Sequence, residues 1–558
     1  MKRLLMIVVV LGACVGIAAA QPSVAAFVNG ASNLLPPLPN SGVAQGSIFI
    51  IYGSNMGPAS LVKAGGTLPW PANLSGTTAS VTVNGTTVNL PLYYTLATQV
   101  AGLLPSSTPV GTGTITVSYN NQNSVTAPIT VVAHGVGIFT AVSNGTGPAI
   151  LTDPVTSDPS KFVITSTNAA NPGQLVDIWA TGMGPVTGND STTPGPVQDM
   201  TASLGVKVWV GATSANVAYS GRSGCCIGED QIRFTVPSGI SGCSVPLTVQ
   251  IGNFISNATT MPIATSGKTC TISNPAVPPS VLQTLLGKSQ VSFGGVFLSR
   301  SISVGASLLP GFPATTTKSD DGSASFLKFS VNAAQAQSLV DTTPIGACLV
   351  TTFTSTNANP YASFTYTSLD AGAQITVNGP GGTQTLAKLT SGGITAYSAQ
   401  FSNSASYLNA GNYTVTGPGG PDVGSFSVPL TIATPLVWTN QSAITTAGVT
   451  RASGVTVNWT GGDPSSTVTI TGSSYQSTGT TTIVGASFTC QAPVSALTFT
   501  VPPPVLLALP PSGTIAGIPF PGTLGVSNGG APVTFTATGL DYGYVQFTAS
   551  NSISVTYN

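Results

Sequence analysis

Charged residues are scarce in this sequence. Only 14 basic and 14 acidic residues occur among 558, and the sole glutamate is Glu229. A nearly neutral chain with scattered charges cannot provide the cluster of lysine and arginine that neutralises nucleic-acid phosphates. We therefore expect no nucleic-acid partner. Solubility must come instead from serine, threonine, asparagine and glycine on the outer faces of the fold.

Long apolar runs are missing after residue 20, so we expect no transmembrane segment. The first twenty residues have the pattern of a signal peptide, because Lys2 and Arg3 precede an apolar stretch and the small residues Ala18–Ala20. We expect cleavage before Gln21. The alternative is a lipoprotein signal, in which Cys14 is lipidated. Both readings predict export, to the medium or to the cell surface.

The residues that favour helices are also few. Lysine, arginine and glutamate are rare, whereas 65 glycines and 43 prolines interrupt the chain. Apolar residues make up 42% of the sequence and alternate with polar ones in short segments, which is typical of half-buried strands. The predicted fold class is all-β, a multidomain string of immunoglobulin-like β-sandwiches.

An internal duplication lies in the first half of the chain. Residues 46–58 read GSIFIIYGSNMGP, and residues 173–185 read GQLVDIWATGMGP, at a constant offset of 127 residues. The hairpin glycine Gly85 likewise has a counterpart in Gly211. A repeat of this length is too long for a solenoid and suits two complete sandwich domains of about seven strands each.

The duplicated motifs carry a family resemblance. An apolar strand, then G-S-N-M-G-P, V-T-V-N-G and a strand ending in P-S resemble the IPT/TIG immunoglobulin-like domains. The tandem arrangement, over roughly residues 27–270, is similar to an uncharacterised family of secreted, acidobacterial-type proteins. These motifs are turn glycines and core positions, so the resemblance implies a fold and no activity.

The expected organisation follows from these segments and from the strand patterns beyond them. It comprises a signal peptide at 1–20, a first sandwich at 21–134, a second sandwich with a disulfide-stapled loop at 135–270, a linker at 271–289, a third sandwich at 290–432 and a fourth at 436–558.

Six cysteines follow the signal peptide, and export makes disulfides the expected state: Cys225, Cys226, Cys243, Cys270, Cys348 and Cys490. Cys225 and Cys226 lie in an insertion relative to the first domain. Adjacent cysteines rarely bond to each other because the ring is strained, so we expect them to reach Cys243 and Cys270. Cys348 and Cys490 would join the third and fourth domains if they pair. A metal site in the cysteine cluster is the alternative, although it lacks CxxC spacing.

Histidine is almost absent. A Ser-His-Asp triad would have to use His134, the only histidine, which lies where the first domain passes into the second. The adjacent acids Glu229–Asp230 and Asp320–Asp321 are explained by loop and turn chemistry. We therefore expect no catalytic residue and no enzymatic activity.

Two weaker ligand hypotheses remain. Asp153, Asp158, Asp320 and Asp321 could supply oxygen ligands to calcium, although no D-x-D-x-D-G run occurs. No other cofactor is expected. Trp70, in the segment LPWPANLSG, is expected in a loop and is the aromatic residue to test for ligand contact.

The function expected from these features is that of a secreted or cell-surface structural or adhesive protein. Its sandwiches would serve as spacers and as binding surfaces for an unknown protein or glycan. A carbohydrate-binding accessory protein is the alternative, and a hydrolase with an unrecognised site is a third. Fold analogy alone supports all three, so the site itself must distinguish them.

Overall fold

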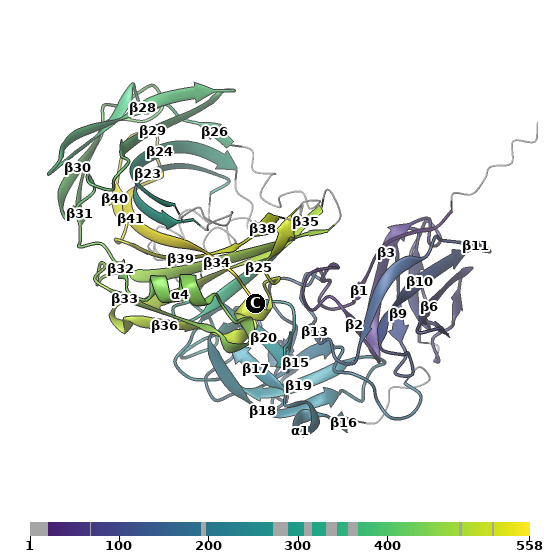
Figure 1. Ribbon diagram of the computed structural model, residues 1–558. Helices are drawn as coiled ribbons and strands as arrows, with labels where there is room; N and C mark the ends of the chain where they lie inside the picture. Colours follow the sequence, from purple (N-terminus) through teal and green to yellow (C-terminus); the bar gives the residue numbers. More distant parts are fainter. Residues whose placement is uncertain are drawn as a thin grey trace, which may run out of the picture.

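The computed structural model describes residues 21–66, 68–190, 197–271, 288–305, 315–330, 343–354, 366–478, 482–515 and 518–558 (Figure 1). The expected signal peptide, with Cys14, lies outside these residues, as does most of the expected linker at 271–289. The all-β fold class with immunoglobulin-like sandwiches is confirmed, since strands dominate every part that the structure describes.

The first module, residues 21–134, consists of two packed sheets. The first sheet has the order β1 (Ser23–Asn29), β3 (Ser47–Ser54), β9 (Gln99–Leu104), β8 (Leu92–Leu96) and β4 (Val62–Lys63). The second has the order β2 (Val43–Ala44), β12 (Ala127–Val132), β10 (Gly111–Tyr119), β6 (Thr77–Val83) and β5 (Asn73–Leu74), with β7 (Thr86–Asn89) and β11 (Gln122–Asn123) beside it. Alternating burial along β6 shows that one face of this sheet meets the core.

The second module, residues 135–271, has a similar set of strands, which join into a single 10-stranded sheet. Its sheet has the order β13 (Gly137–Ile138), β15 (Leu175–Thr181), β19 (Asp230–Thr235), β18 (Thr213–Arg222), β17 (Lys207–Val210), β20 (Gly242–Ile251) and β21 (Phe254–Ile255). Shorter elements flank it: β14 (Leu151–Thr152), β16 (Gln198–Asp199), β22 (Thr259–Ile263) and the helix α1 (Thr201–Leu204).

The duplicated motif has the same structural role in both modules. Met56 and Met183, of the two M-G-P triplets, are each fully buried in the core of their own module. The matching hairpin glycines Gly85 and Gly211 both have positive φ, which explains why glycine occupies both turns. The repeat therefore records equivalent core and turn positions.

The two modules meet through hydrogen bonds between buried groups. The side-chain amide of Asn29 donates to the carbonyl oxygens of Gly135 and Thr181, at 3.0 and 3.1 Å. Arg222 of β18 donates to the carbonyl oxygen of Gly46 at 2.9 Å. Separating the modules would break these hydrogen bonds and expose the buried junction to water, which opposes hinge motion.

The carboxyl-terminal half is organised around one 14-stranded sheet. The order along its path is β25 (Cys348–Thr354), β35 (Thr482–Pro493), β34 (Thr467–Thr478), β39 (Gly522–Gly529), β41 (Tyr542–Val555), β23 (Gln290–Val304), β24 (Thr316–Ser330), β29 (Ile394–Ser402), β28 (Gly382–Ser391), β27 (Gln374–Gly379), β30 (Gly411–Gly417) and β31 (Phe426–Ile432). The strands β26 (Tyr366–Ser368) and β40 (Val533–Phe535) pair beside this path.

This sheet corrects the expected division into 290–432 and 436–558. The first strand of the expected third domain, β23, pairs in parallel with the last long strand of the chain, β41, from Phe293–Tyr542 to Val304–Ile553. The strand β25, also from the third range, pairs with β35 of the fourth. The two ranges are therefore interleaved, and Figure 1 shows their strands as a continuous curved layer.

Two hydrophobic cores lie along this sheet, and β41 contributes to both. Val545, Phe547 and Ala549 belong to the third core, together with strands from β23 to β31. Ile553 and Val555 belong to the fourth core, which also contains the buried Trp438 and Trp459. One strand thus links the two cores without an intervening linker.

The remaining elements cover the fourth core. They are the sheet of β32 (Val437–Trp438), β33 (Val455–Thr460) and β36 (Thr498–Val501), the hairpin of β37 (Gly513–Ile515) and β38 (Ile518–Phe520), and the short helices α4 (Gln441–Ala447) and α5 (Pro503–Leu507). Within the described part of the chain, no helix has the length and apolar character to cross a membrane.

Candidate functional site

The strongest candidate for a binding surface is a group of aromatic side chains on the first module. The strand β8 lies near the edge of its sheet, and its pairing with β9 shifts register between Leu92 and Tyr94. Such a bulge re-aims a side chain. Tyr93 lies at the shift, with 37% of its surface exposed, while Tyr94 is half-buried.

Trp70 completes this group from the loop after β4. Its ring centroid lies 5.0 Å from that of Tyr93, and the ring of Tyr93 lies 5.9 Å from that of Tyr94 in an edge-on arrangement. The loop is fixed to β8 by backbone hydrogen bonds from Ala64 to Tyr93 and from Leu92 to Pro71. We call Trp70, Tyr93 and Tyr94 the aromatic face.

The aromatic face is uncharged. Burial, with smaller contributions from Tyr52 and Tyr93, raises the pKa of Tyr94 to about 12, so its hydroxyl stays protonated. That hydroxyl donates to the side-chain oxygen of Gln99 at 3.1 Å. The only charged residue paired with this part of the strand is Lys63, which lies opposite Tyr94 in β4.

This arrangement suits a ligand with apolar faces and hydroxyl groups. Aromatic rings offer broad apolar surfaces, and tyrosine and tryptophan add a polar group at the rim. Leu61 and Leu68 extend the exposed apolar surface in the adjoining segment. Sugar rings carry C–H groups on one face and hydroxyls around the edge, so stacking on the aromatic face requires no charge on the glycan.

The expectation that Trp70 lies in a loop is met, and its ring is partly exposed. Its partners in the aromatic face were not predicted. The sequence contains the pair Tyr93–Tyr94 in a strand, where strict alternation would point the two rings to opposite faces. The bulge at Tyr93, which the sequence does not mark, interrupts this alternation, and the ring of Tyr93 contacts both Trp70 and Tyr94.

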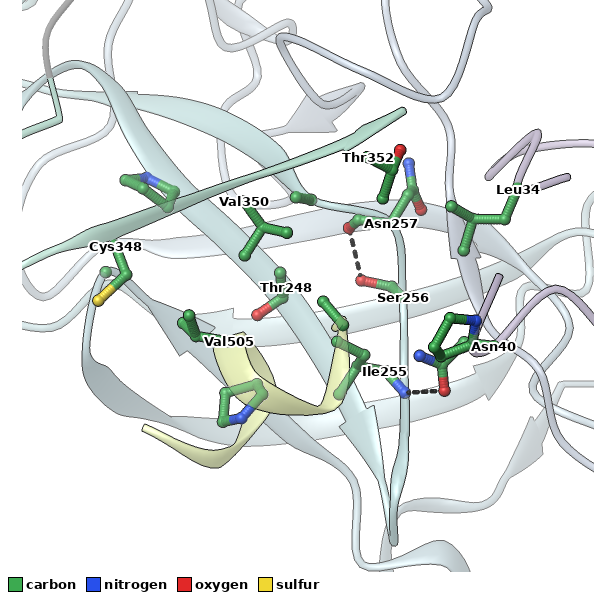
Figure 2. Close-up of a pocket in the computed structure, with 16 residues that line it drawn as sticks. Leu34, Asn40, Thr248, Ile255, Ser256, Asn257, Cys348, Val350, Thr352 and Val505 are labelled. Carbon is green, nitrogen blue, oxygen red and sulfur yellow. Dashed lines mark hydrogen bonds between the residues drawn. The ribbon is translucent and has the colours of Figure 1, made fainter. Parts of the chain in front are cut away.

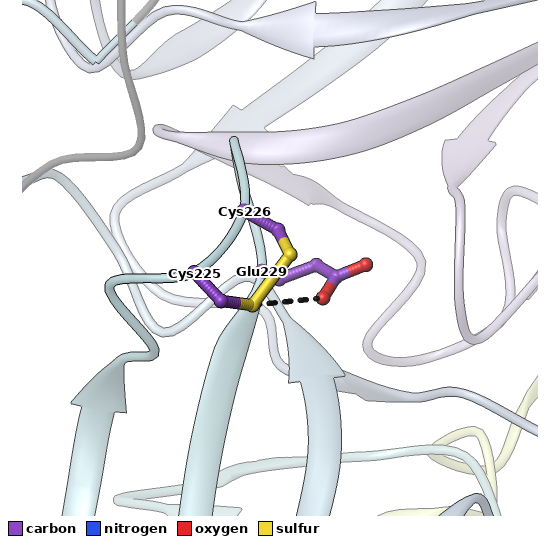
Figure 3. Close-up of side chains that lie close together, drawn as sticks. All are labelled: Cys225, Cys226 and Glu229. Carbon is purple, nitrogen blue, oxygen red and sulfur yellow. Dashed lines mark hydrogen bonds between the residues drawn. A yellow bond between two sulfur atoms is a disulfide. The ribbon is translucent and has the colours of Figure 1, made fainter. Parts of the chain in front are cut away.

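The inserted loop of the second module holds a second cluster of reactive side chains. Cys225 and Cys226 are joined to each other, and the Glu229 carboxylate lies beside them (Figure 3). Glu229 Oε2 is 3.8 Å from Cys225 Sγ. Burial, and then the neighbouring Asp230, raise the pKa of Glu229. In the described residues, this is the only cluster of three or more potential metal ligands.

The expected links from Cys225 and Cys226 to Cys243 and Cys270 are wrong. Cys243 bonds instead to Cys270. The physical reason is the strand β19, whose six residues separate the inserted loop from the turn before Cys243. Such a strand spans roughly 20 Å, whereas the two Cα atoms of a disulfide lie about 4 to 7 Å apart.

Cys348 and Cys490 do pair, but within one core rather than between two domains. They face each other across β25 and β35, and both belong to the fourth core. The disulfide therefore secures the strand β25 in a core whose other buried residues all lie from Leu436 onward.

The four aspartates considered as calcium ligands each form hydrogen bonds or an ion pair of their own. Asp153 and Asp158 accept hydrogen bonds from backbone amides of their own loops. Asp320 lies inside β24 and not in the expected turn, and its carboxylate is fully buried against Arg300. Asp321 accepts a hydrogen bond from Ser319. The four are not gathered into one site.

His134 lies at the junction of the first two modules. Its Nδ1 is 2.8 Å from the carbonyl oxygen of Met183, which can only accept, so Nδ1 carries the proton. Gly184 packs against the ring, and a Cβ at that position would come within 2.5 Å of Nδ1. The histidine contributes to the module junction.

A small crevice lies where the first two modules meet the carboxyl-terminal half (Figure 2). It is lined by Leu34, Ile255, Val350 and Val505 among others, and Asn40 bridges the parts by accepting from the Ile255 amide. Its volume of about 30 Å³ holds a water molecule or two at most. This crevice is a packing junction, too small for a glycan or a cofactor.

No family model matches this chain, and no curated protein matches it. The IPT/TIG and acidobacterial resemblance therefore stays a prediction. Several solved structures are distantly similar. SGBP-B from a complex xyloglucan utilization locus in Bacteroides uniformis is 10% identical, with a TM-score of 0.19 over 74% of this chain and 97% of that one.

Two further solved structures are similar at the same low level. Domains 5–6 of the S-layer protein SbsC are 14% identical, with a TM-score of 0.16 over 43% of this chain and 98% of that one. The I9–I11 tandem from titin is 9% identical, with a TM-score of 0.11 over 69% of this chain and 93% of that one. These likenesses are too distant to bear on function.

Proposed function

We propose that this chain is a structural and adhesive protein, secreted or attached to the cell surface, that holds a glycan-binding face on a stiff body of β-sandwich modules. The observation that carries the proposal is the aromatic face of Trp70, Tyr93 and Tyr94. It is partly exposed, free of anionic neighbours in its own strands, and fixed to a sheet edge by backbone hydrogen bonds.

The stiffness of the body supports the adhesive role. The Asn29 and Arg222 contacts tie the first module to the second, and the amide of Ala212 donates to the carbonyl oxygen of Gly346 in the carboxyl-terminal half. A binding face on a stiff body loses little conformational freedom when it engages a partner, which favours affinity.

The second candidate is a carbohydrate-binding accessory protein that acts beside an enzyme on another chain. The same aromatic face favours it, because either role requires glycan binding. The proposal includes no catalytic step: His134 donates from Nδ1 to a backbone carbonyl, and Asp320 is paired with Arg300.

Export is part of the proposal and rests on the sequence of residues 1–20. We expect the intact mass of the secreted protein to correspond to a chain beginning at Gln21. A mass that includes a lipid on Cys14 would indicate anchoring, and a mass that includes residues 1–20 would contradict export.

A glycan panel tests the function. The mature protein is applied to neutral and acidic polysaccharides in parallel, and bound protein is quantified. We expect retention on one or more neutral glycans and no preference for acidic ones. A pull-down from the native envelope then separates the two candidates, because a co-purifying hydrolase supports the accessory role. Binding to none of the glycans, or to acidic ones alone, contradicts the proposal.

A further inference from the structure

We propose that the inserted loop of the second module is a redox-gated binding site for one thiophilic divalent cation, of the zinc and cadmium kind. Cys225, Cys226 and Glu229 supply the ligands, and the site exists only when the Cys225–Cys226 bond is reduced. This site is separate from the aromatic face, so the outcome for one proposal does not decide the other.

The distances fit a small tetrahedral cation. In such a site, metal–sulfur distances of about 2.3 Å and metal–oxygen distances of about 2.1 Å place sulfur and oxygen roughly 3.6 Å apart. Glu229 Oε2 lies 3.8 Å from Cys225 Sγ, and the ligand atoms of all three residues lie within 4.8 Å of one another. Only a small opening of the two sulfur atoms is needed to admit the ion.

The surroundings favour this loop over the other two disulfides as the one that opens. Cys225 is exposed and Cys226 half-buried, whereas Cys243 is half-buried and Cys270, Cys348 and Cys490 are buried. A thiolate that attacks a disulfide must reach a sulfur atom, so access controls which bond is reduced. Among the described disulfides, the Cys225–Cys226 bond is the only one with an exposed cysteine, so we expect it to open first.

The scaffold on both sides of the loop keeps the ligands together after reduction. Ile227 is buried, and Gly228 packs against Ile48 and Leu103 of the first module. The carbonyl oxygen of Gly228 accepts a hydrogen bond from the hydroxyl of Thr181. These contacts fix the backbone between the cysteines and Glu229, so the site is largely formed before the ion arrives.

A dithiol can serve as the reductant that opens the Cys225–Cys226 bond. The dithiol becomes a cyclic disulfide, and its two electrons and two protons convert the Cys225–Cys226 bond into two thiols. A divalent cation then displaces both thiol protons and binds two thiolates and the Glu229 carboxylate, while water takes the exposed fourth position. Reoxidation reverses the sequence and releases the ion.

The test uses the mature protein and Cd²⁺ as the probe. The protein is treated with a limiting dithiol, the opened cysteines are identified by alkylation and mass spectrometry, and Cd²⁺ is titrated while thiolate-to-metal charge-transfer absorbance is followed. We expect Cys225 and Cys226 to open first, one Cd²⁺ to bind per reduced chain, and the oxidised protein to give no signal.

Two variants locate the site. The double variant Cys225→Ser/Cys226→Ser is expected to abolish the signal. Because both residues lie in a surface loop, we expect this variant to fold like the parent protein, and circular dichroism checks its fold. Glu229→Gln is expected to weaken Cd²⁺ binding at least about tenfold. Equal binding by the double variant, opening of a buried disulfide first, or open thiols that bind no Cd²⁺ overturns the proposal.

Discussion

At the scale of single residues, Asp320 shows how a strand can hold a charge in a core. Its carboxylate is fully buried and accepts hydrogen bonds from the Arg300 guanidinium and from the amides of Tyr407 and Leu408. Burial alone would raise the pKa of Asp320, but these hydrogen bonds and the Arg300 charge together hold it below its ordinary value. The carboxylate therefore belongs to the third core as a charged group.

The substitution Asp320→Asn should destabilise the carboxyl-terminal half by about 3 kcal/mol at neutral pH, because it leaves Arg300 without its counter-charge. A lowered pKa contributes stability that is present above about pH 4 and is lost as the pH falls below it. The variant should lack this part of the acid dependence. Denaturant unfolding at pH 7 and pH 3 measures both effects. Asp321→Asn is the matched control, and an equal loss there would contradict this account.

Asp230 represents the opposite case at the junction of the first two modules. Burial raises the pKa of Asp230 to about 6, and this outweighs the opposing effects of Arg222 and of the Met183 and Gly182 amides. A raised carboxyl pKa means that this group favours the folded state at low pH and that the contribution is lost as the pH rises through about 6. The contribution of Asp230 to the stability of the junction is therefore largest in mild acid.

Arg222→Met tests this pairing. At pH 8 the variant leaves a buried, charged Asp230 without its partner, and we expect a loss of about 3 kcal/mol in unfolding free energy. At pH 5 Asp230 is protonated, so the loss should be clearly smaller. Lys161→Met, which removes an exposed ion pair, should change stability little at either pH. Equal penalties for Arg222→Met at both pH values would show that Asp230 does not titrate in this range.

At the scale of elements, the predictions that rest on local sequence signals were confirmed, and those that depend on which strands pair were not. The alternating segments and the duplicated turn glycines predicted the sandwiches of the first two modules, because both signals are local. The length of β19 could have excluded a link from Cys225 or Cys226 to Cys243, although it does not by itself identify Cys270 as the partner of Cys243. The pairing of β23 with β41 could not have been predicted, because it joins residues about 250 positions apart and leaves no local signal.

The disulfides should contribute unequally to stability. Cys243 and Cys270 are 27 residues apart, and in the chain-entropy model such a link contributes about 3.5 kcal/mol. The bond between Cys225 and Cys226 closes no chain loop, so the model gives it almost no entropic contribution. We expect Cys243→Ser/Cys270→Ser to lower the midpoint of unfolding of the second module, and Cys225→Ser/Cys226→Ser to leave it nearly unchanged. The reverse order would contradict the observed connectivity.

Because the strand β41 contributes to both cores, we predict that two fragments of the carboxyl-terminal half differ in their ability to fold. A fragment of residues 288–432 lacks Val545, Phe547 and Ala549, which complete the third core, so it should not fold cooperatively. The fragment 288–558 contains both cores and should fold. Thermal unfolding followed by near-ultraviolet circular dichroism distinguishes them. A cooperative transition for the fragment 288–432 alone would contradict this account and would support the independent third domain that the sequence predicted.

At the scale of the whole molecule, the modules form an interlocked body with the aromatic face on its first module. Composition predicted the all-β fold class, since a chain with so few helix-forming residues and so many short alternating segments favours sandwiches. It did not predict the aromatic face, because that face depends on a bulge and on a loop packed beside it. Trp70 alone could be named from its loop context, and Tyr93 could not.

The most direct test of the central claim is the affinity of the mature protein for a neutral glycan that it retains, measured by titration calorimetry. Trp70→Ala and Tyr93→Ala should each weaken binding at least about tenfold, because each removes a ring from the contact surface. Tyr366→Ala, which removes a similarly exposed ring from the carboxyl-terminal half, should leave the affinity unchanged. Unchanged affinity in both aromatic-face variants, with the fold intact, would contradict the assignment of glycan binding to this face.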